Sequence, residues 1–401
     1  MKKKKENISI VGGAGHVGLP LSLIFANKGY NVNIYDKDEK SLALIKKNKM
    51  PFMEENALSY LKKANLKKKL ILSSNINELD INGPIIICIG TPVDEFNNPT
   101  VNLIFKCIDE IKPFLKSNSL IIFRSTLFPG SSEVIKKYLR KNKLRCLLSF
   151  CPERILQGKS IKEIKKLPQI VSSFDKESSK QTIKLFTGIS PSFIECNPHE
   201  AELIKLFTNS FRYINFAIAN QFYKISKNMN INFNRLAKIM SYKYPRVTIP
   251  SAGFAAGPCL YKDTQQLSSY SKNEFSLGSL SININEGFIF DAIDEIKNNY
   301  NINNTRVGIL GMSFKANIDD TRSSLSYKLK KYLKLYAKDV LTHDPYVKND
   351  KSILNIKEFL YKSDVFVLCT PHDYYKKINF GKKRVIDFWG LLDNNNIKII
   401  K

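Results

Sequence analysis

The first third of the chain alternates short apolar runs with amphipathic stretches, a pattern typical of βαβ units in a parallel sheet. The apolar runs predict strands at 8–11, 31–35, 85–89, 120–123 and 144–150. The amphipathic stretches predict helices at 19–28, 39–47, 57–63, 101–116 and 132–142. We therefore expect a doubly wound sheet that is complete by about residue 195.

A long helical pattern follows. Apolar residues recur at helical spacing between Pro198 and about Met229, at Ala201, Ile204, Phe207, Phe211, Ile214, Ile218, Phe222 and Ile225. No glycine and no further proline interrupts this stretch, so it predicts one long helix in a mostly helical region that reaches Tyr300. A loop at 244–263 is expected to interrupt the region.

The strand pattern returns in the last hundred residues. Strands are predicted at 305–311, 340–342, 365–369 and 384–386, with helices at 325–335 and 356–361. This alternation predicts a second, smaller α/β domain.

The composition is that of an ordinary soluble globular protein, with 43% hydrophobic and 25% charged residues. No apolar run reaches the roughly 18 residues that cross a bilayer, so no membrane association is expected. The basic residues 2–5 precede a strand rather than a signal-peptide core, which predicts a cytoplasmic protein. The net charge of +27 is spread over nearly every helix and favours a solvated basic surface over a dedicated nucleic-acid site. Such a surface would still attract a diphosphate.

Seven scattered cysteines form no Cys-x-x-Cys pair, and the four histidines are not closely paired. These spacings argue against a disulfide framework and against a metal site.

A dinucleotide-binding fingerprint lies between the first predicted strand and helix, as Gly13-Ala14-Gly15-His16-Val17-Gly18. Its glycines permit a tight turn, close approach of a pyrophosphate and helix packing, and the helix N-terminus supplies amide donors. Asp36 ends the next strand, where its carboxylate can bind both ribose hydroxyls and repel a 2′-phosphate. The pattern predicts NAD as cofactor.

A second chemical feature is the segment Gly253 to Asp263, in which Cys259 follows a glycine-rich turn. A turn of this kind displays a reactive thiolate rather than packing a core cysteine. An NAD site and a nucleophilic thiol in one chain suggest an oxidation that passes through a covalent thio-adduct.

An ordered set of motifs resembles the UDP-glucose/GDP-mannose dehydrogenase family over nearly the whole chain. Besides the fingerprint and the cysteine loop, it comprises Gly90-Thr91-Pro92, Ser125-Thr126, Pro129-Gly130, Pro152-Glu153-Arg154, Glu202, Lys205, Asn209, Phe314-Lys315, Asp320-Thr321-Arg322 and Asp344-Pro345. The resemblance implies an enzyme that oxidises the C6 alcohol of a UDP-sugar to a carboxylate with two NAD.

The resemblance also implies site residues. Cys259 is the nucleophile that forms a thiohemiacetal and then a thioester, and Lys205 and Asn209 stabilise its oxyanions. Asp263 orders a water, and Thr126 and Glu153 position that water for thioester hydrolysis. Cofactor contacts are implied for Gly13, Gly15, His16, Val17, Gly18, Asp36, Thr91, Pro92 and Thr126. Substrate contacts are implied for Arg246, Gly253, Phe254, Gly257, Lys315 and Arg322.

Three details refine this resemblance. Ala256-Gly257-Pro258 replaces the paired glycines that are common before the cysteine, and Gln221 and Ser323 stand where glutamates are usual. The Gly-His-Val-Gly-Leu-Pro and Tyr-Pro-Arg-Val segments resemble the UDP-N-acetylhexosamine and UDP-N-acetylmannosamine branch. A homodimer through the central helical domain is expected.

The predicted fold is therefore of the α/β class and has three domains. They are an N-terminal Rossmann-like doubly wound NAD-binding domain at 1–197, a central helical domain with a long helix and the cysteine loop at 198–300, and a smaller C-terminal Rossmann-like UDP-binding domain at 301–401.

Two other functions stay open at this point. A β-hydroxyacid-type NAD dehydrogenase pairs similar domains but needs no cysteine, and it leaves the residues after Tyr300 without a purpose. A non-catalytic binding protein for nucleotide sugars or nucleic acid would explain the charge of +27 but not the coexistence of Cys259, Lys205, Asn209 and Asp263.

Overall fold

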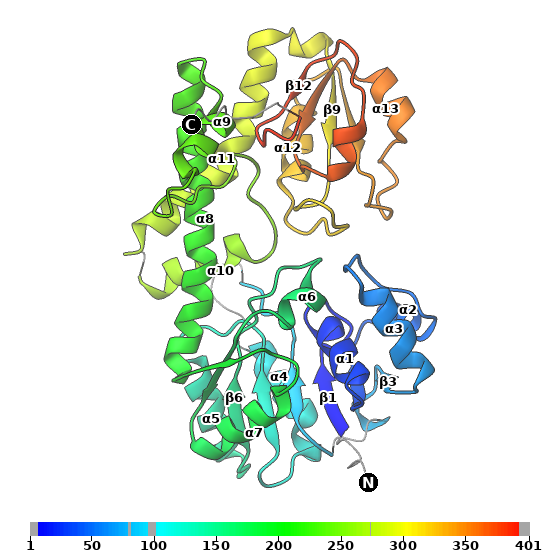
Figure 1. Cartoon of the computed structure of the whole chain (residues 1–401), viewed down its shortest axis with the longest axis vertical. Coiled ribbons are helices and arrows are strands. Elements are labelled where there is room, and N and C mark those ends of the chain that lie inside the picture. The colour runs from blue at the N-terminus through cyan, green and yellow to red at the C-terminus, as the bar shows by residue number, and fades with distance from the viewer. Residues whose placement is uncertain (1–6, 79–81, 95–101, 273, 393–401) are drawn as a thin grey trace. The chain divides into compact units, whose positions relative to one another are not determined.

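The computed structural model describes residues 7–78, 82–94, 102–272 and 274–392 (Figure 1). The chain forms two compact units, Met1–Leu206 and Phe207–Lys401, which we call the first and the second unit. Their boundary lies within helix α8 (Pro198–Asn228). The basic residues 2–5 and the first residue of the predicted helix at 101–116 lie outside the described residues. The division into three domains stays a prediction.

The first unit is built on a sheet that has, within the described residues, the strand order β3-β2-β1-β4-β5-β6-β7-β8. Its strands are β1 (Asn7–Val11), β2 (Asn31–Tyr35), β3 (Leu70–Ser73), β4 (Ile85–Ile87), β5 (Leu120–Phe123), β6 (Leu147–Phe150), β7 (Gln169–Ser173) and β8 (Phe193–Cys196). Neighbouring strands are parallel, with Ile8 opposite Val32 for example. The exception is β6 with β7, which are antiparallel.

Helices cover both faces of this sheet (Figure 1). They are α1 (Gly18–Asn27), α2 (Glu39–Lys46), α3 (Ala57–Leu66), α4 (Asn102–Ile111), α5 (Ser131–Lys141), α6 (Ser160–Ile164) and α7 (Lys176–Phe186), with short 3-10 turns at Ile76–Glu78 and Lys112–Phe114. Successive strand residues point to opposite faces. Ile10 of β1 therefore packs in one core with α1 and α3, whereas Val11 packs in another with α4 and α5.

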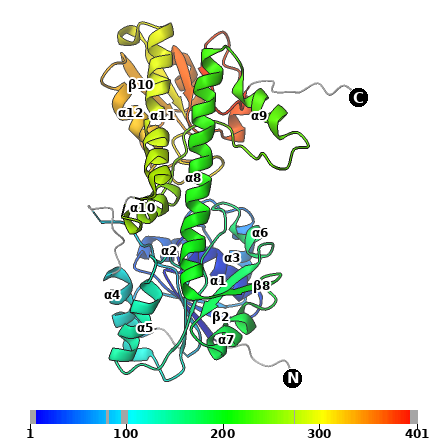
Figure 2. The same ribbon diagram turned by 90° about the vertical axis from the view of Figure 1, so that its left-hand side faces the viewer.

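The second unit begins with helices. Most of α8 lies beside α11 (Ser276–Asn299) (Figure 2). The same unit also contains the shorter helices α9 (Phe233–Ser241) and α10 (Leu260–Tyr270). Asn220 of α8 donates a hydrogen bond of 3.0 Å to Asn285 of α11. An ion pair of 2.9 Å joins Lys224 to Asp291. Polar contacts as well as apolar packing thus hold the two long helices together.

A smaller parallel sheet completes the second unit, with the order β10-β9-β11-β12. Its elements are β9 (Arg306–Leu310), α12 (Leu325–Leu333), β10 (Asp339–His343), α13 (Ile356–Lys362), β11 (Val365–Leu368) and β12 (Val385–Ile386), with 3-10 turns at Ile302–Asn304 and Asp373–Lys377. Phe288 and Ile289 of α11 share one core with Val307 and Ile309 of β9. This shared core explains why the helices and the small sheet form a single compact unit.

The predicted fold class is confirmed: a large sheet that is parallel but for one pair, a helical region and a small parallel sheet follow one another. The long helix predicted from Pro198 is α8. Two predicted bounds were wrong, and the strands β3, β7 and β8 were not predicted. The loop at 244–263 ends earlier, because α10 begins at Leu260 and contains Asp263. The helix predicted to reach residue 116 ends as α4 at Ile111, where Pro113 cannot donate a helical hydrogen bond.

Candidate active site

The predicted cofactor residues gather at one edge of the large sheet. Strand order reverses at β1, so the loops after β1 and β4 leave the sheet in a crevice that favours ligand binding. The fingerprint follows β1, Thr91 follows β4, Thr126 follows β5 and Glu153 follows β6. Because these four strands are parallel neighbours, their carboxyl ends lie at the same edge.

The glycine turn leaves the backbone open on one side. At Gly18, an added Cβ would lie 2.2 Å from the Gly12 carbonyl oxygen, so only glycine permits this close contact of α1 with the turn. At Gly15, which is exposed, an added Cβ would meet only that oxygen, at 3.6 Å. The turn is packed at its base and accessible at its tip, which fits the approach of a pyrophosphate.

Asp36 closes the turn from the end of β2. Its Oδ2 accepts a hydrogen bond of 2.9 Å from the Ala14 N–H, and its Oδ1 accepts one of 3.0 Å from the Asp38 N–H. The neighbouring Lys37 forms an ion pair of 2.5 Å with Glu110. A carboxylate held in this way beside the turn suits a ribose diol, so the residues present fit an NAD site.

Two further predicted loops meet beside this turn. The Thr91 hydroxyl donates a hydrogen bond of 2.8 Å to the Thr126 carbonyl oxygen, and the Ser125 hydroxyl donates one of 2.6 Å to the Ile89 carbonyl oxygen. The His16 ring contacts the Phe52 ring, with centroids 3.9 Å apart and the ring planes tilted by 38°. Pro92 is exposed, and Val17 is half-buried before α1.

Glu153 is buried and makes an ion pair that was not predicted. One carboxylate oxygen accepts from the backbone N–H groups of Arg154 and Ile155 at 2.8 and 3.0 Å. The other is paired with the guanidinium of Arg124. Arg124 directly precedes the Ser125-Thr126 motif, which was the available signal, but its partner is distant in the sequence.

Cys259 is placed as a reactive thiol would be. It is the N-cap residue of α10, where the helix dipole favours negative charge. Of the seven cysteines it is the exposed one. Burial raises the pKa of Cys88 and of Cys151 to about 12, which is typical of core thiols. The thiol of Cys259 also interacts electrostatically with the guanidinium of Arg322.

Asp263 lies one helical turn after Cys259 and is fully buried. Its Oδ2 accepts a hydrogen bond of 2.6 Å from the Asn209 amide, and Lys262 Nζ lies 3.1 Å from its Oδ1. The structure therefore brings three predicted residues, Cys259, Asp263 and Asn209, into one neighbourhood of the second unit. Lys205 lies one turn before Asn209 on α8.

The cysteine loop packs on the small sheet of the same unit. Gly257 faces the Phe314 ring and donates a hydrogen bond of 3.2 Å to the Ser323 carbonyl oxygen. Gly253 faces the Trp389 ring, and Phe254 is buried among core phenylalanines. Backbone contacts thus hold the loop beside the segment that carries the predicted UDP-binding residues.

The predicted UDP-binding residues lie at the carboxyl end of β9. Lys315 is half-buried, and the exposed Arg322 is held by the Asp320 carboxylate, with contacts of 2.6 to 3.0 Å. Arg246 lies on the loop after α9 and is exposed. Its guanidinium donates a 3.0 Å hydrogen bond to the Tyr244 hydroxyl and stacks on that ring. No other predicted site residue contacts it among the interactions of the described residues.

Three models of one protein family match the chain in order. They are the NAD binding domain at residues 6–189, the central domain at 199–286 and the UDP binding domain at 308–394. The chain belongs to the UDP-glucose/GDP-mannose dehydrogenase family. It is an NAD-dependent oxidoreductase of the UDP-sugar dehydrogenase type.

Within this family, the chain is 30% identical to the UDP-N-acetyl-D-mannosamine dehydrogenase of Methanococcus aeolicus, over 100% of this chain and 92% of that protein. It is 26% identical to the UDP-glucose 6-dehydrogenase of Rickettsia conorii, over 98% and 97% respectively. The solved structure of UDP-D-ManNAc dehydrogenase from Pyrococcus horikoshii is 26% identical, covers 97% of this chain and 96% of that one, and superposes with a TM-score of 0.89.

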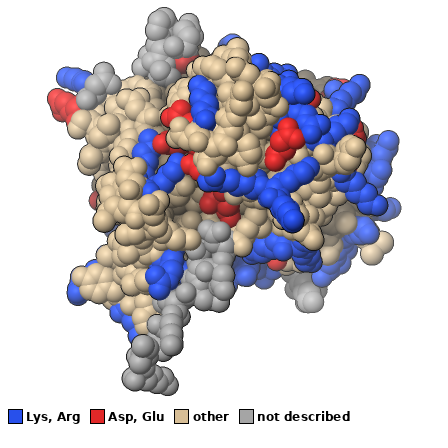
Figure 3. All heavy atoms as spheres, turned by 90° about the horizontal axis from the view of Figure 1, so that it is seen from above, with Lys and Arg blue, Asp and Glu red and all other residues tan. Residues whose placement is uncertain are grey.

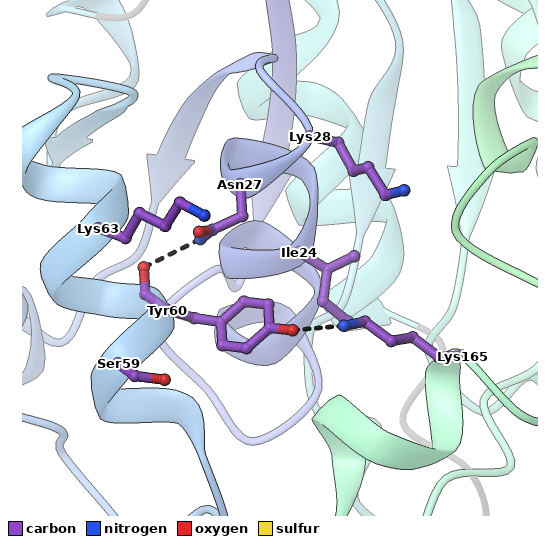
Figure 4. Close-up of a pocket in the computed structure, with 7 residues that line it drawn as sticks. All are labelled: Ile24, Asn27, Lys28, Ser59, Tyr60, Lys63 and Lys165. Carbon is purple, nitrogen blue, oxygen red and sulfur yellow. Dashed lines mark hydrogen bonds between the residues drawn. The ribbon is translucent and has the colours of Figure 1, made fainter.

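A cavity of about 400 Å³ lies outside the family motifs, between α1, α3 and α6 (Figure 4). Lys28, Lys63 and Lys165 line it together with the Tyr60 ring, and Lys165 contacts the Tyr60 hydroxyl. Each lysine lies at the C-terminal end of one of the three helices. Helix dipoles favour cations at these ends, so the presence of the three lysines is explained without invoking a bound ligand.

Two surface properties complete the description. Lysine and arginine side chains are scattered over the face in Figure 3, with carboxylates among them. Within the described residues no helix is long and apolar enough to span a bilayer. In the same part of the chain no three His, Cys, Asp or Glu side chains gather as a metal site would require.

Proposed function

We propose that the protein oxidises the C6 alcohol of a UDP-N-acetylhexosamine to the uronic acid, with UDP-N-acetyl-D-mannosamine as the favoured substrate. Two things support this choice of sugar: the Gly-His-Val-Gly-Leu-Pro and Tyr-Pro-Arg-Val segments, and the higher identity to UDP-N-acetyl-D-mannosamine dehydrogenases than to UDP-glucose 6-dehydrogenases. The observation that carries the chemistry is the exposed Cys259 at the start of α10, one turn before the buried Asp263.

The proposed reaction has four steps. When bound, NAD would take up a hydride from C6 in each of two oxidations, and the hydroxyl proton lost in each oxidation passes to solvent. After the first, the Cys259 sulfur bonds to the aldehyde carbon and the thiol proton passes to the carbonyl oxygen, which gives a thiohemiacetal. The second oxidation removes the C6 hydride and the hydroxyl proton and leaves a thioester. Water then adds to the thioester carbonyl, the C–S bond breaks, and the acid leaves while Cys259 regains its proton.

The roles of the side chains follow from this sequence. The Asn209 amide and the Lys205 ammonium stabilise the negative oxygen of each tetrahedral adduct. Asp263, oriented by Asn209, orders a water and takes part in proton transfer. Thr126 and Glu153 position the water that hydrolyses the thioester.

Substrate binding is assigned to the second unit. Lys315 and Arg322 would pair with the diphosphate, for which ammonium and guanidinium groups are suited. Gly253 and Gly257 keep the backbone of the cysteine loop close to Trp389 and Phe314, and Arg246 contributes from the exposed loop. The buried Phe254 would act through the packing of the loop.

The direct test follows NADH absorbance with UDP-N-acetylmannosamine, UDP-N-acetylglucosamine and UDP-glucose. We expect two NADH per sugar with the first substrate, and no carboxylate product from Cys259→Ala. Cys196→Ala, in which a half-buried thiol is removed, is the control and should stay active. One NADH per sugar, or full turnover by Cys259→Ala, would support a β-hydroxyacid-type enzyme. No NADH from any nucleotide sugar would support a binding protein.

A homodimer and a cytoplasmic location complete the proposal. Support for the dimer comes from a row of large apolar side chains that are exposed on α8, Phe207, Phe211, Ile218, Phe222 and Ile225, and from the exposed Met229 directly after the helix. A second copy of the chain would cover this row. The cytoplasmic location rests on the sequence alone.

A further inference from the structure

A buried arginine lies beside Glu153 in the first unit. Arg124 follows β5 directly and has only 3% of its surface exposed. Such burial is costly for a charged side chain unless it is paired and hydrogen-bonded. The groups that pair with Arg124 therefore indicate its role.

The guanidinium of Arg124 bridges the three neighbouring strands β5, β6 and β7. Its Nη2 is ion-paired with Glu153, which follows β6. Its Nη1 donates a hydrogen bond of 2.9 Å to the side-chain oxygen of Gln169, the first residue of β7. The amide nitrogen of Gln169 donates in turn to the Ile170 carbonyl oxygen at 2.8 Å, which fixes the orientation of the amide. The Phe186 ring packs 5.3 Å from the guanidinium carbon.

The Glu153 carboxylate is held at both of its oxygens. One accepts from two backbone N–H groups, at 2.8 and 3.0 Å, and the other is paired with Arg124. Burial lowers the pKa of Arg124, but the charge and hydrogen bond of Glu153 more than offset this, so the pKa lies above its usual value. Arg124 is thus a permanent cation that limits rotation of the carboxylate.

We propose that Arg124, itself oriented by Gln169, is a positioning residue that holds the Glu153 carboxylate in the orientation needed for hydrolysis of the Cys259 thioester. The inference rests on the proposed function, because it assigns Glu153 to the hydrolytic step. The antiparallel pairing of β6 with β7 places Gln169 beside Arg124, on the side away from the cofactor turn in strand order. A purely structural ion pair would tie the strands together without affecting one chemical step.

The test is a rapid-mixing measurement of NADH with Arg124→Lys and Glu153→Gln. Lysine keeps the charge but loses the two-pronged geometry. If only hydrolysis is slowed, each variant releases a burst of two NADH per active site. Its steady-state turnover should then be about 100-fold slower than that of the wild type, which is the size of effect that misplaced catalytic groups have. The mass of the protein should rise by the acyl group on Cys259. Arg306→Lys, which alters a more exposed arginine–carboxylate pair with Asp364 in the second unit, should show no burst.

A double-mutant cycle separates positioning from a general loss of activity. The variant carrying both Arg124→Lys and Glu153→Gln should be no slower in hydrolysis than Glu153→Gln alone, because both changes affect one group. Two results would overturn the inference. One is a double variant whose losses in hydrolysis rate are additive. The other is a folded Arg124→Lys that hydrolyses the thioester at the wild-type rate while Glu153→Gln accumulates acyl-enzyme. Absence of acyl-enzyme in Glu153→Gln would instead overturn the proposed function.

A second variant guards against misfolding. Breaking a buried ion pair costs about 3–5 kcal/mol, so a change at Arg124 can reduce the folded fraction. Gln169→Leu leaves the ion pair intact and removes only the amide that orients Arg124. It should fold and show the same burst with a smaller decrease in the hydrolysis rate. If folded Gln169→Leu and folded Arg124→Lys both hydrolyse the thioester at the wild-type rate, the Arg124–Glu153 ion pair has only a structural role.

Discussion

His343 shows how a single buried side chain links pH to stability. It ends β10, is 5% exposed and lies among the rings of Phe359, Tyr374 and Tyr375. Burial lowers the pKa of His343 to about 4. The charge of Asp344 opposes this shift, whereas His372 adds to it. In the unfolded chain a histidine titrates near its ordinary value of about 6.5.

We expect the second unit to lose stability as the pH falls from about 6.5 to about 4. In that window the unfolded chain binds a proton that the folded chain does not, so the free energy of unfolding decreases by up to about 3 kcal/mol. Urea unfolding, followed by the fluorescence of Trp389, the one tryptophan of the chain, measures it. His343→Gln should flatten this dependence, whereas His199→Gln, which removes an exposed ring, should not. Equal slopes for all three proteins would contradict the assignment.

The site residues that the sequence predicts belong to local patterns. The glycine turn, Asp36 and Cys259 stand out because their neighbours in the sequence also define their surroundings. Arg124 could not be found in this way. Its partners lie 29 and 45 residues away, and they meet it only because β5, β6 and β7 are neighbours in the sheet.

Among the elements, the long helix α8 and the apolar strands were predicted, whereas β3, β7 and β8 of the large sheet were not. The 31-residue helix α8 and the buried central strands follow from their periodicity. β7 (Gln169–Ser173) is mostly buried but was missed, because only Ile170 and Val171 in it are apolar. β3 and β8 were missed because neither has a buried face along its length, and most of their residues are partly exposed. They lie at opposite ends of the sheet, where burial no longer imposes a pattern.

The cysteine loop offers a test at the scale of an element. Gly257 has φ +102°, and an added Cβ would lie 2.4 Å from the Phe314 ring. Gly257→Ala must therefore strain the backbone and displace Phe314, so we expect a loss of about 1–3 kcal/mol in stability and a large fall in kcat. Gly287→Ala in α11 is the control, because an added Cβ there has no neighbour within 4 Å. Helix propensity should make it more stable by about 0.5–1 kcal/mol. An active, stable Gly257→Ala would show that the loop does not depend on this contact.

The whole molecule raises the question of what covers the exposed row on α8. Phe211 and Met229 are 68% and 67% exposed, and the row continues with helical spacing along one face of the helix. Contiguous exposed apolar side chains of this size mark interaction surfaces in proteins. Since a homodimer has the same surface on both subunits, a row along one helix can pair with its own copy.

We expect the wild-type chain to sediment as a dimer of the 45.9 kDa subunit and the variant carrying Phe211→Asp and Phe222→Asp to sediment as a monomer. The reason is that two carboxylates per subunit would be buried without partners in the interface, which costs far more than the lost apolar contact. Leu66→Asp is the control, because Leu66 is 84% exposed at the end of α3 but lies outside the row. Leu66→Asp should remain a dimer. A wild-type monomer would exclude this face as the interface, and so would a dimer that persists in the α8 variant as it does in Leu66→Asp. Activity measured on the same samples shows whether the Arg246 loop needs the partner: a folded monomer with unchanged KM would place all substrate contacts within one chain.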